Sequence, residues 1–375
     1  MMIDLRSDTF TLTSAAMREV MARAEEGDDY YGEDKSVNRL QDYCKELFRK
    51  EDALFTTTGM LANQLAVASQ VAPGNEVITE YSYHLNLYES AQHARFCNVV
   101  LNARQTEDGI LGAAEIERAI SSKPREPIYA QVELVAVENT VNSRQGKIFP
   151  IERLAEIREF TANRGIALHL DGARLFNAHI ATGIPLSDYA AKADTVSVCF
   201  SKGLGAPLGS MLLGPREIIE RARRLRVWHG SGFHQIGISA AAAHYGLTHQ
   251  LERLREDHRL TRLLAERLAE SRLFEICLSD IQTNMIYLNL AGGPSIAEEF
   301  IARAAERGVL AYSFPPSAVR LVVCRNVEEL EIVKAADILL RICQEMAQES
   351  PGRASSERLL RRDSLVAYNS SRHEP

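Results

Sequence analysis

A lysine, an aspartate and a threonine–glycine turn are the residues of this 375-residue chain whose types and positions could do chemistry together. Lys202 follows a short run in which Val196, Val198 and Phe200 alternate with smaller residues, a pattern that predicts a strand. Glycines follow the lysine at once. A lysine at the end of a buried strand can be desolvated and used as an amine nucleophile, although such a lysine can also simply extend into solvent.

Asp171 ends a second predicted strand, at residues 166–170, and Gly172 follows it. Roughly 30 residues separate Asp171 from Lys202, which is the length of one right-handed βαβ unit of a parallel sheet. Ligands of open α/β sheets bind beyond the carboxyl ends of the strands. We therefore expect the carboxylate and the amine to face the same crevice.

The third feature is Thr58-Gly59-Met60, which lies between a predicted strand at 53–55 and a predicted helix. A strand, a glycine turn and a helix N-terminus leave backbone N–H groups and the positive end of the helix dipole at one spot, which suits a phosphate. The alternative is a plain N-cap at Thr58. His84 follows a further predicted strand, where it could be a packed histidine or an active-site imidazole.

These residues fit the requirements of pyridoxal phosphate (PLP). This cofactor needs an amine for a Schiff base, an acid that keeps its pyridinium nitrogen protonated, and an anion site for its phosphate. Lys202, Asp171 and the Thr58-Gly59 turn supply one of each, and His84 is placed to stack on the ring. We expect no metal site, because the six cysteines are scattered and form no C-x-x-C pair.

The elements that must position these residues alternate between strands and helices, which predicts an α/β fold with a mainly parallel sheet, followed by a smaller α+β domain. We expect an N-terminal segment at 1–14 that packs with the active site and a large PLP-binding domain at 15–250. A small C-terminal domain at 251–348 and a polar tail at 349–375 follow.

Composition excludes several classes of partner. The net charge of −7 offers no basic surface for nucleic acid, and no apolar run approaches the roughly 18 residues that span a bilayer. The N-terminus has no apolar signal region, and the scattered cysteines suit reduced thiols. We expect a cytoplasmic enzyme that acts on a small molecule.

Two further candidates keep open alternatives. Tyr30 and Tyr31 lie in an acidic, glycine-containing loop and could be core anchors or a lid over a flat ligand. Arg320 lies on a predicted strand, where its charge needs a carboxylate partner from either a substrate or a structural acid.

The motifs around these residues resemble the low-specificity L-threonine aldolases of the β-eliminating lyase group, which have the aspartate-aminotransferase-like fold (PLP fold type I). The resemblance covers about residues 3–245 and extends more weakly through Arg320. The matching stretches are Ile3-Asp-Leu-Arg-Ser-Asp-Thr, Gly27-Asp-Asp-Tyr-Tyr-Gly-Glu-Asp, Val37-Asn-Arg-Leu, Asn63-Gln-Leu-Ala, His169-Leu-Asp-Gly-Ala-Arg-Leu-Phe-Asn-Ala and Ser197-Val-Cys-Phe-Ser-Lys-Gly-Leu-Gly-Ala-Pro.

The resemblance implies a role for each matching residue. Lys202 would carry the cofactor as a Schiff base, Asp171 would pair with the pyridinium, and His84 would stack on the ring. The phosphate would lie at Thr58, Gly59 and Met60. The α-carboxylate of an amino-acid substrate would bind Ser7, Arg174 and Arg320, with Arg174 also near the cofactor. Tyr31 would line the pocket, in a homodimer or homotetramer with shared active sites.

The resemblance implies cleavage of β-hydroxy-α-amino acids to glycine and an aldehyde, or the reverse reaction. The chain departs from the family at Thr58-Gly-Met-Leu, at Gly230-Ser-Gly-Phe-His234-Gln, which lacks an arginine, and at Val141, where the family has a histidine that is thought to orient or deprotonate the β-hydroxyl. Valine can do neither, so His84 or a water would be the base, or the substrate would carry a bulkier, more apolar β-substituent. The alternatives are a PLP-dependent racemase or β-elimination lyase, and a catalytically silent paralogue that serves as a binding or scaffold protein.

Overall fold

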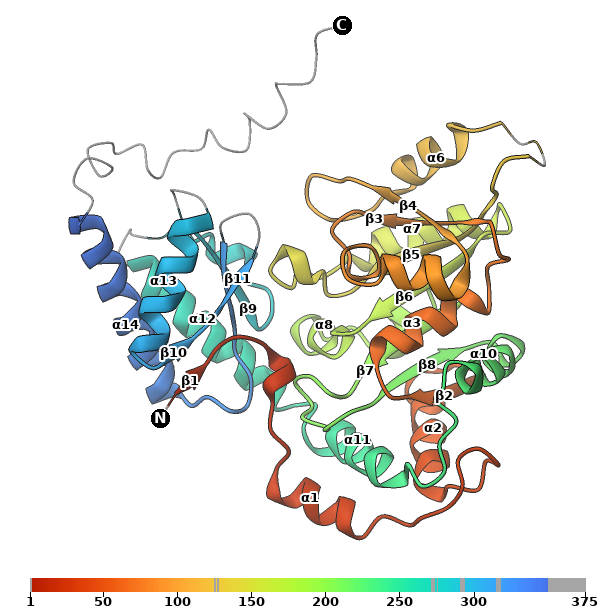
Figure 1. Ribbon diagram of the computed structural model, residues 1–375, viewed down its shortest axis with the longest axis horizontal. Coiled ribbons are helices and arrows are strands. Elements are labelled where there is room, and N and C mark those ends of the chain that lie inside the picture. The colour runs from red at the N-terminus through yellow and green to blue at the C-terminus, as the bar shows by residue number, and fades with distance from the viewer. Residues whose placement is uncertain are drawn as a thin grey trace, which may run out of the picture. The chain divides into compact units, whose positions relative to one another are not determined.

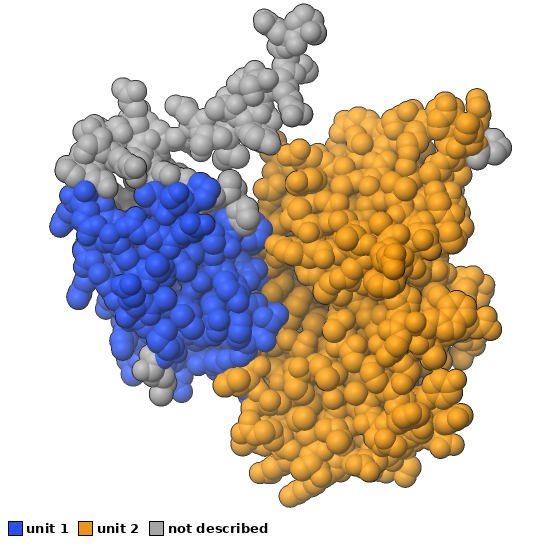
Figure 2. Space-filling view, in the orientation of Figure 1, with its two compact units in different colours: residues 1–10, 257–375 blue, residues 11–256 orange. Residues whose placement is uncertain are grey.

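The computed structural model describes residues 2–124, 126, 128–270, 274, 276–290, 294–314 and 318–349. Two compact units divide the chain (Figure 2): one is Thr11–Glu256, and the other comprises residues 1–10 and the described residues from 257 onward. Apart from Glu349, the predicted polar tail lies outside the described residues. A search of the described helices finds none that is long and apolar enough to cross a membrane.

A seven-stranded mixed sheet runs through the larger unit (Figure 1). Five neighbouring strands are parallel, and β8 and β2 complete one edge through two antiparallel pairings, so the predicted mainly parallel sheet is confirmed. The spatial order is β2 (Asp52–Thr56), β8 (Ser210–Gly214), β7 (Thr195–Cys199), β6 (Ala167–Gly172), β5 (Val132–Glu138), β3 (Glu76–Glu80) and β4 (Val100–Arg104).

Both faces of this sheet are buried, because successive side chains of a strand point to opposite faces. Leu54 of β2 and Leu212 of β8 belong to a cluster with residues of α3 and α10. Phe55 and Leu213, their neighbours along the strands, belong instead to the main core cluster of the unit. The apolar strands therefore form the middle layer of an α/β/α arrangement.

Helices connect and cover the strands. Those of the larger unit are α1 (Ala15–Ala22), α2 (Lys35–Phe48), α3 (Gly59–Ala68), α4 (His84–Leu87), α5 (Ser90–Gln92), α6 (Ala113–Ser121), α7 (Ile151–Ala162), α8 (Leu175–Thr182), α9 (Leu186–Ala190), α10 (Arg216–Trp228) and α11 (Gly237–His249). Shorter turns are the π-helical η2 (His93–Cys97) and the 3-10 helix η3 (Asn142–Arg144). α12 (Leu254–Glu270) carries the chain from the larger unit into the smaller one.

The smaller unit is α+β. Strands β11 (Tyr312–Phe314), β12 (Ala318–Val322) and β9 (Met285–Asn289) form an antiparallel sheet, in that order. β1 (Ile3–Asp4) pairs in parallel with β10 (Val309–Leu310), so the start of the chain joins this unit. The 3-10 turns η1 (Asp8–Phe10) and η4 (Leu278–Asp280) and the helices α13 (Pro294–Glu306) and α14 (Glu329–Glu349) complete it, with apolar residues from these elements in its core.

Candidate active site

The N-terminus of α3 has an N-cap at Thr58 and keeps the geometry that the predicted anion site requires. The Thr58 hydroxyl accepts the N–H of Leu61 at 3.1 Å, as an N-cap should. The N–H groups of Gly59 and Met60 precede the first intrahelical donor of the helix, so they remain open to a ligand. The Ser210 hydroxyl is buried without a hydrogen-bond partner among the described residues and lies 3.7 Å from the point where a Cβ on Gly59 would be. A phosphate would satisfy these donors together.

Lys202 lies in the tight connection between β7 and β8. The N–H of Ala206 donates to the carbonyl of Phe200 at 3.1 Å, and the N–H of Gly205 donates to the carbonyl of Lys202 at 2.9 Å. Gly205 has φ +74°, a conformation that favours glycine. The lysine side chain is half-buried, and its amine has no hydrogen bond or ion pair with any residue that the structure describes. The loop therefore presents an amine that no described residue engages.

Asp171 is buried at the carboxyl end of β6, the parallel neighbour of β7. Its Oδ1 accepts the N–H of Ala173 at 3.0 Å, and its Oδ2 accepts Nδ2 of Asn63 at 2.8 Å. The expectation that Asp171 and Lys202 lie at the same edge of the sheet, at the ends of adjacent parallel strands, is confirmed.

Asn63 of α3 connects Asp171 to a buried polar network. Its Oδ1 accepts the hydroxyl of Ser197 at 2.8 Å and Nε2 of His169 at 3.1 Å, which turns its amide nitrogen toward the carboxylates. Nδ1 of His169 bonds the Thr195 hydroxyl at 2.9 Å. Burial lowers the pKa of His169 to about 4, so this imidazole is neutral and donates from one nitrogen while it accepts at the other.

His84, the first residue of α4, forms a pair with the buried carboxylate of Glu89. Nδ1 of His84 bonds Oε1 of Glu89, which also accepts Nδ2 of Asn63 at 3.2 Å. Burial alone would lower the pKa of His84, but the hydrogen bond and charge of Glu89, with the charges of Asp171 and Glu138, raise it. Burial would likewise raise the pKa of Glu89, and the two histidines beside it, His84 and His93, lower it instead.

The side chains of His84, Glu89 and Asp171 are linked in one hydrogen-bonded chain through the amide of Asn63. One nitrogen or oxygen of each lies within 4.8 Å of the others. These atoms are already engaged with one another or with Asn63, so we interpret the cluster as a hydrogen-bonded chain that orients the imidazole.

Glu138 supports the same chain from the end of β5. Its two carboxylate oxygens accept the N–H of His84 at 2.5 Å and that of Asn142 at 2.7 Å. Burial, with the nearby charge of Asp171, raises the pKa of Glu138 to about 7. Glu138 therefore fixes both the start of α4 and the loop that carries Asn142.

Arg174 is buried at the N-cap position of α8, three residues beyond Asp171. Its guanidinium donates to Oδ1 of Asn142 at 3.3 Å. The loop that Glu138 holds thus also orients this arginine. Val141 lies in the same loop, where its side chain is fully buried in the main core cluster.

Three further predicted site residues lie on elements outside this group. Tyr31 is 72% exposed, and its ring packs edge-on against Tyr30 with centroids 5.1 Å apart. Ser7 and Arg320 belong to the smaller unit, where the Arg320 guanidinium donates to the carbonyl of Arg6 at 3.2 Å. Their contribution to the site stays a prediction.

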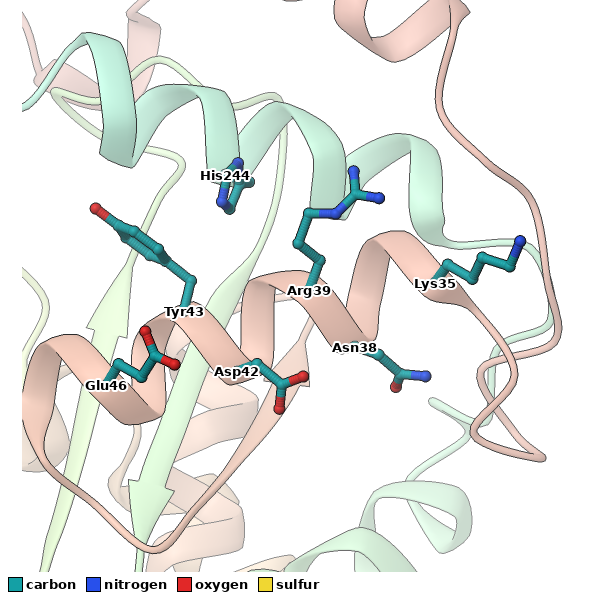
Figure 3. A pocket seen from close by; sticks show the side chains of 7 residues that line it. All are labelled: Lys35, Asn38, Arg39, Asp42, Tyr43, Glu46 and His244. Carbon is teal, nitrogen blue, oxygen red and sulfur yellow. The ribbon is translucent and has the colours of Figure 1, made fainter.

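An open depression of about 470 Å³ lies elsewhere, along one face of α2 (Figure 3). His244 of α11 faces α2 there, with its ring centroid 5.1 Å from that of Tyr43. Lys35 and Arg39, the cations of this surface, are both paired with Glu25. The depression contains none of the predicted site residues; it is lined by Lys35, Asn38, Arg39, Asp42, Tyr43, Glu46 and His244.

Sequence reasoning missed Asn63, Glu89 and Glu138 as site residues. Asn63 and Glu138 lie within or beside motifs that mark the family resemblance, and Glu89 follows His84 by five residues. The sequence could have indicated them as polar residues within otherwise apolar elements, because a buried polar group needs hydrogen-bond partners.

Comparisons with known proteins agree with the fold and the motifs. A model of the β-eliminating lyase family matches residues 4–291. The low specificity L-threonine aldolase of Escherichia coli K12 is 40% identical over 89% of this chain and 97% of its own. The low-specificity L-threonine aldolase 1 of Arabidopsis thaliana is 35% identical over 88% of this chain and 93% of its own.

Solved structures share the fold at lower sequence identity. The threonine aldolase of Leishmania major superposes with a TM-score of 0.78 and 20% identity, and the match covers 91% of this chain and 99% of that one. The predicted fold type I architecture and the resemblance to the threonine aldolases are therefore confirmed.

Proposed function

The chain belongs to the β-eliminating lyase family, and from this premise we propose that it is a PLP-dependent aldolase of the L-threonine aldolase type. It is a carbon–carbon lyase that cleaves β-hydroxy-α-amino acids to glycine and an aldehyde, or runs the reverse reaction. The observation that carries the proposal is the connected chain His84–Glu89–Asn63–Asp171. Lys202 follows the strand next to that of Asp171, and its amine has no protein partner among the described residues.

The residues of the larger unit fit PLP. Lys202 would hold the cofactor covalently through its amine, and Asp171 would hold the ring nitrogen. The phosphate would accept hydrogen bonds from the N–H groups of Gly59 and Met60, beside Thr58, and from the buried hydroxyl of Ser210, which no described residue engages. When bound, PLP supplies a sink for the electron pair that remains when the Cα–Cβ bond breaks.

His84 is the base that takes the proton of the β-hydroxyl. Its Nδ1 is engaged by Glu89, which leaves Nε2 as the nitrogen available to a substrate, and its side chain is 34% exposed. Glu89 also stabilises the imidazolium that forms, because its carboxylate is buried and ionised. Such proton transfers typically contribute about 10²–10⁴-fold to rate.

Arg174 of the larger unit would bind the α-carboxylate of the substrate; the same role for Ser7 and Arg320 is what the family resemblance implies. Asn142 orients the Arg174 guanidinium, whose planar donors suit a bidentate carboxylate. Fixing the carboxylate fixes which bond at Cα aligns with the cofactor ring, so this arginine contributes to the choice of the bond that breaks.

Val141 favours β-substituents larger and more apolar than methyl. The side chain is buried and offers neither a donor nor an acceptor where the family has a histidine. The hydroxyl proton therefore goes to His84, and selectivity for a β-substituent rests on apolar contact, which discriminates less sharply than a hydrogen bond.

A second copy of the chain would complete the site. Tyr31 and Trp228 are each 72% exposed, and Phe96 packs near His229 on the surface of the same unit. The loop that carries Tyr31 is held firmly, because Arg226 and Asp29 form a buried ion pair at 2.7 Å. A firmly held loop with exposed aromatic rings suits a homodimer or homotetramer in which Tyr31 enters the neighbouring site.

A substrate panel tests the reaction. Purified enzyme with PLP would be incubated with L-threonine, L-allo-threonine, phenylserine and L-alanine, and glycine, aldehyde and D-alanine would be measured. We expect glycine and aldehyde, with the highest kcat/KM for phenylserine. D-alanine without glycine would identify a racemase, an oxo acid and ammonia would identify β-elimination, and no turnover with no cofactor binding would identify a scaffold protein; each of these results contradicts the proposal.

A further inference from the structure

The fully buried carboxylate of Glu89 lies between two histidines, and the proposed reaction uses only one of them. His84 bonds Oε1, whereas Nε2 of His93 lies 3.5 Å from Oε2. Glu89 and His93 are both 0% exposed, and neither Oε2 nor Nε2 has a hydrogen bond with another described residue. Burying a carboxylate oxygen without a hydrogen-bond donor costs free energy, so we ask whether the nearby imidazole is its donor.

An α-type turn places His93 toward Glu89, because the N–H of His93 donates to the carbonyl of Glu89 at 3.1 Å. His93 begins η2, a π-helical segment that directly follows α5, and π-helical turns are frequent at functional sites. Glu89 and His93 are four residues apart on this short helical stretch, so their side chains lie on one face. The segment is joined to α3 because the thiol of Cys97 donates to the carbonyl of Gln64 at 3.6 Å.

The ring nitrogen that faces Glu89 must carry the proton. A lone pair on Nε2 of His93 would repel the carboxylate oxygen, whereas an N–H group attracts it. The other nitrogen, Nδ1, lies 3.7 Å from Sγ of Cys97. Burial raises the pKa of Cys97 to about 12, so the thiol keeps its single proton, which it donates to the carbonyl of Gln64. The carboxylate of Glu89 itself therefore selects the form of His93 that carries a proton on Nε2.

We propose that His93 is a positioning residue for the aldol reaction: its Nε2–H group is directed at Oε2 of Glu89 and keeps that carboxylate ionised, which holds His84 with Nδ1 engaged and Nε2 free for the substrate. His93 acts through Glu89 and does not touch the substrate. The role rests on the proposed function, in which His84 is the base. It also places a second imidazole in the hydrogen-bonded chain that ends at His84, in a protein that has valine at position 141.

Other charged and polar groups also lie around the His84–Glu89 pair and affect where it holds its proton. The charges of Asp171 on β6 and Glu138 on β5 raise the pKa of His84. His169 on β6 is neutral, and Asn63 on α3 donates to Oε1 of Glu89. Among these neighbours, His93 is the one whose donor faces Oε2. Its removal should therefore raise the proton affinity of the His84–Glu89 pair, whichever of the two holds the proton.

Three variants test this role: His93→Leu, which removes the donor; His93→Gln, which keeps an N–H donor that does not titrate; and His179→Gln, a control at an imidazole that bonds the carbonyl of Ile184. The first measurement is the pH profile of kcat/KM of the holoenzyme with phenylserine. We expect His93→Leu to move the acid limb upward by about one pH unit and to lower kcat/KM about 10-fold on that limb. His93→Gln and His179→Gln should keep the wild-type limb.

The second measurement does not depend on turnover. The rate at which diethyl pyrocarbonate modifies His84 reports the neutral imidazole, and peptide mass spectrometry assigns the site. Its pH midpoint in the full-length protein should move upward in His93→Leu by the same amount. An unmoved midpoint in a folded His93→Leu protein would overturn the inference, and so would an equal shift in His93→Gln. Wild-type enzyme without aldol cleavage would instead refute the proposed function, while the modification rates still tested the link from His93 to His84.

Discussion

The side-chain nitrogen of Asn63 lies 2.8 Å from Oδ2 of Asp171, and the same nitrogen reaches Oε1 of Glu89 at 3.2 Å. One neutral amide therefore separates the carboxylate proposed for the cofactor ring from the carboxylate that orients the proposed base. Two buried carboxylates in contact would compete for a proton, because their like charges repel. A shared amide donor satisfies one oxygen of each carboxylate.

Replacing Asn63 should weaken cofactor binding. Asn63→Leu removes a hydrogen bond to each of two charged groups, and such a bond contributes about 1.5–3 kcal/mol. We expect the dissociation constant of PLP to rise by roughly 10–100-fold, measured by fluorescence titration of the apoenzyme. Gln70→Leu is the matched control, because Gln70 bonds Thr195 at the far end of the same network. Equal PLP affinity in Asn63→Leu and wild type would show that Asp171 does not need the amide.

Lys202 should be the residue that carries PLP. Borohydride reduction of the wild-type holoenzyme should fix the cofactor to the peptide that contains Lys202, as read by mass spectrometry. Lys202→Ala should lose both this adduct and the visible absorbance of the bound cofactor, because the amine is the only part of the side chain that can form the bond. Lys35→Ala, at an exposed lysine paired with Glu25, should keep both. An adduct at another lysine in wild type would overturn the assignment.

His169 should make the larger unit sensitive to acid. Its pKa lies at about 4 in the folded protein against 6.5 ordinarily, so the unfolded chain binds the proton more readily between these values. The stability that depends on the neutral imidazole is therefore present above about pH 6.5 and is lost as pH falls toward 4.

His169→Gln keeps a donor and an acceptor but does not titrate, so it should remove this part of the pH dependence. Chemical unfolding from pH 4.5 to 8 would measure the difference from wild type, which should grow toward acid by up to about 3 kcal/mol. His229→Gln serves as the control, at an imidazole that bonds the carbonyl of Leu225. Parallel stability curves for wild type and His169→Gln would show that this histidine does not titrate on unfolding.

The sequence predicted the parts of the site that follow from local pattern and from the geometry of parallel sheets. Asp171 and Lys202 each follow an apolar run, and the register of β6 and β7 brings the ends of those runs together. The N-cap at Thr58 is likewise a local feature. Such features depend on residues close in the sequence, which is why pattern alone finds them.

The residues that the sequence did not predict depend on contacts between distant segments. Asn63 bonds Asp171, which is 108 positions away in the sequence, and Glu89, which is 26 positions away. No periodicity of the sequence predicts either pairing. The exposure of Tyr31 follows from a loop held by the ion pair of Asp29 with Arg226, whose partners also lie far apart in the chain. The chemical type of each residue was visible in the sequence, but its partner was set by the packing of α3 against the sheet and the adjoining loops.

Val141→His should restore a second imidazole at the position where the family has one. We expect kcat/KM for L-threonine to rise relative to phenylserine by about 10-fold, less than the roughly 10²–10⁴-fold of a positioned acid or base, because His84 already serves as the base. Val141 is fully buried, so a larger polar side chain should also cost about 1–3 kcal/mol of stability.

Val141→Gln separates these two effects, because glutamine is similar in length and polarity to histidine but cannot take up the proton. Thermal unfolding of both variants would show whether they are equally destabilised, and the substrate ratio would then report the base alone. A ratio that rises in both variants would attribute the change to lost apolar contact with the β-substituent. A ratio that rises in neither, with both proteins folded, would mean that Val141 does not face the substrate and that His84 serves threonine and phenylserine alike.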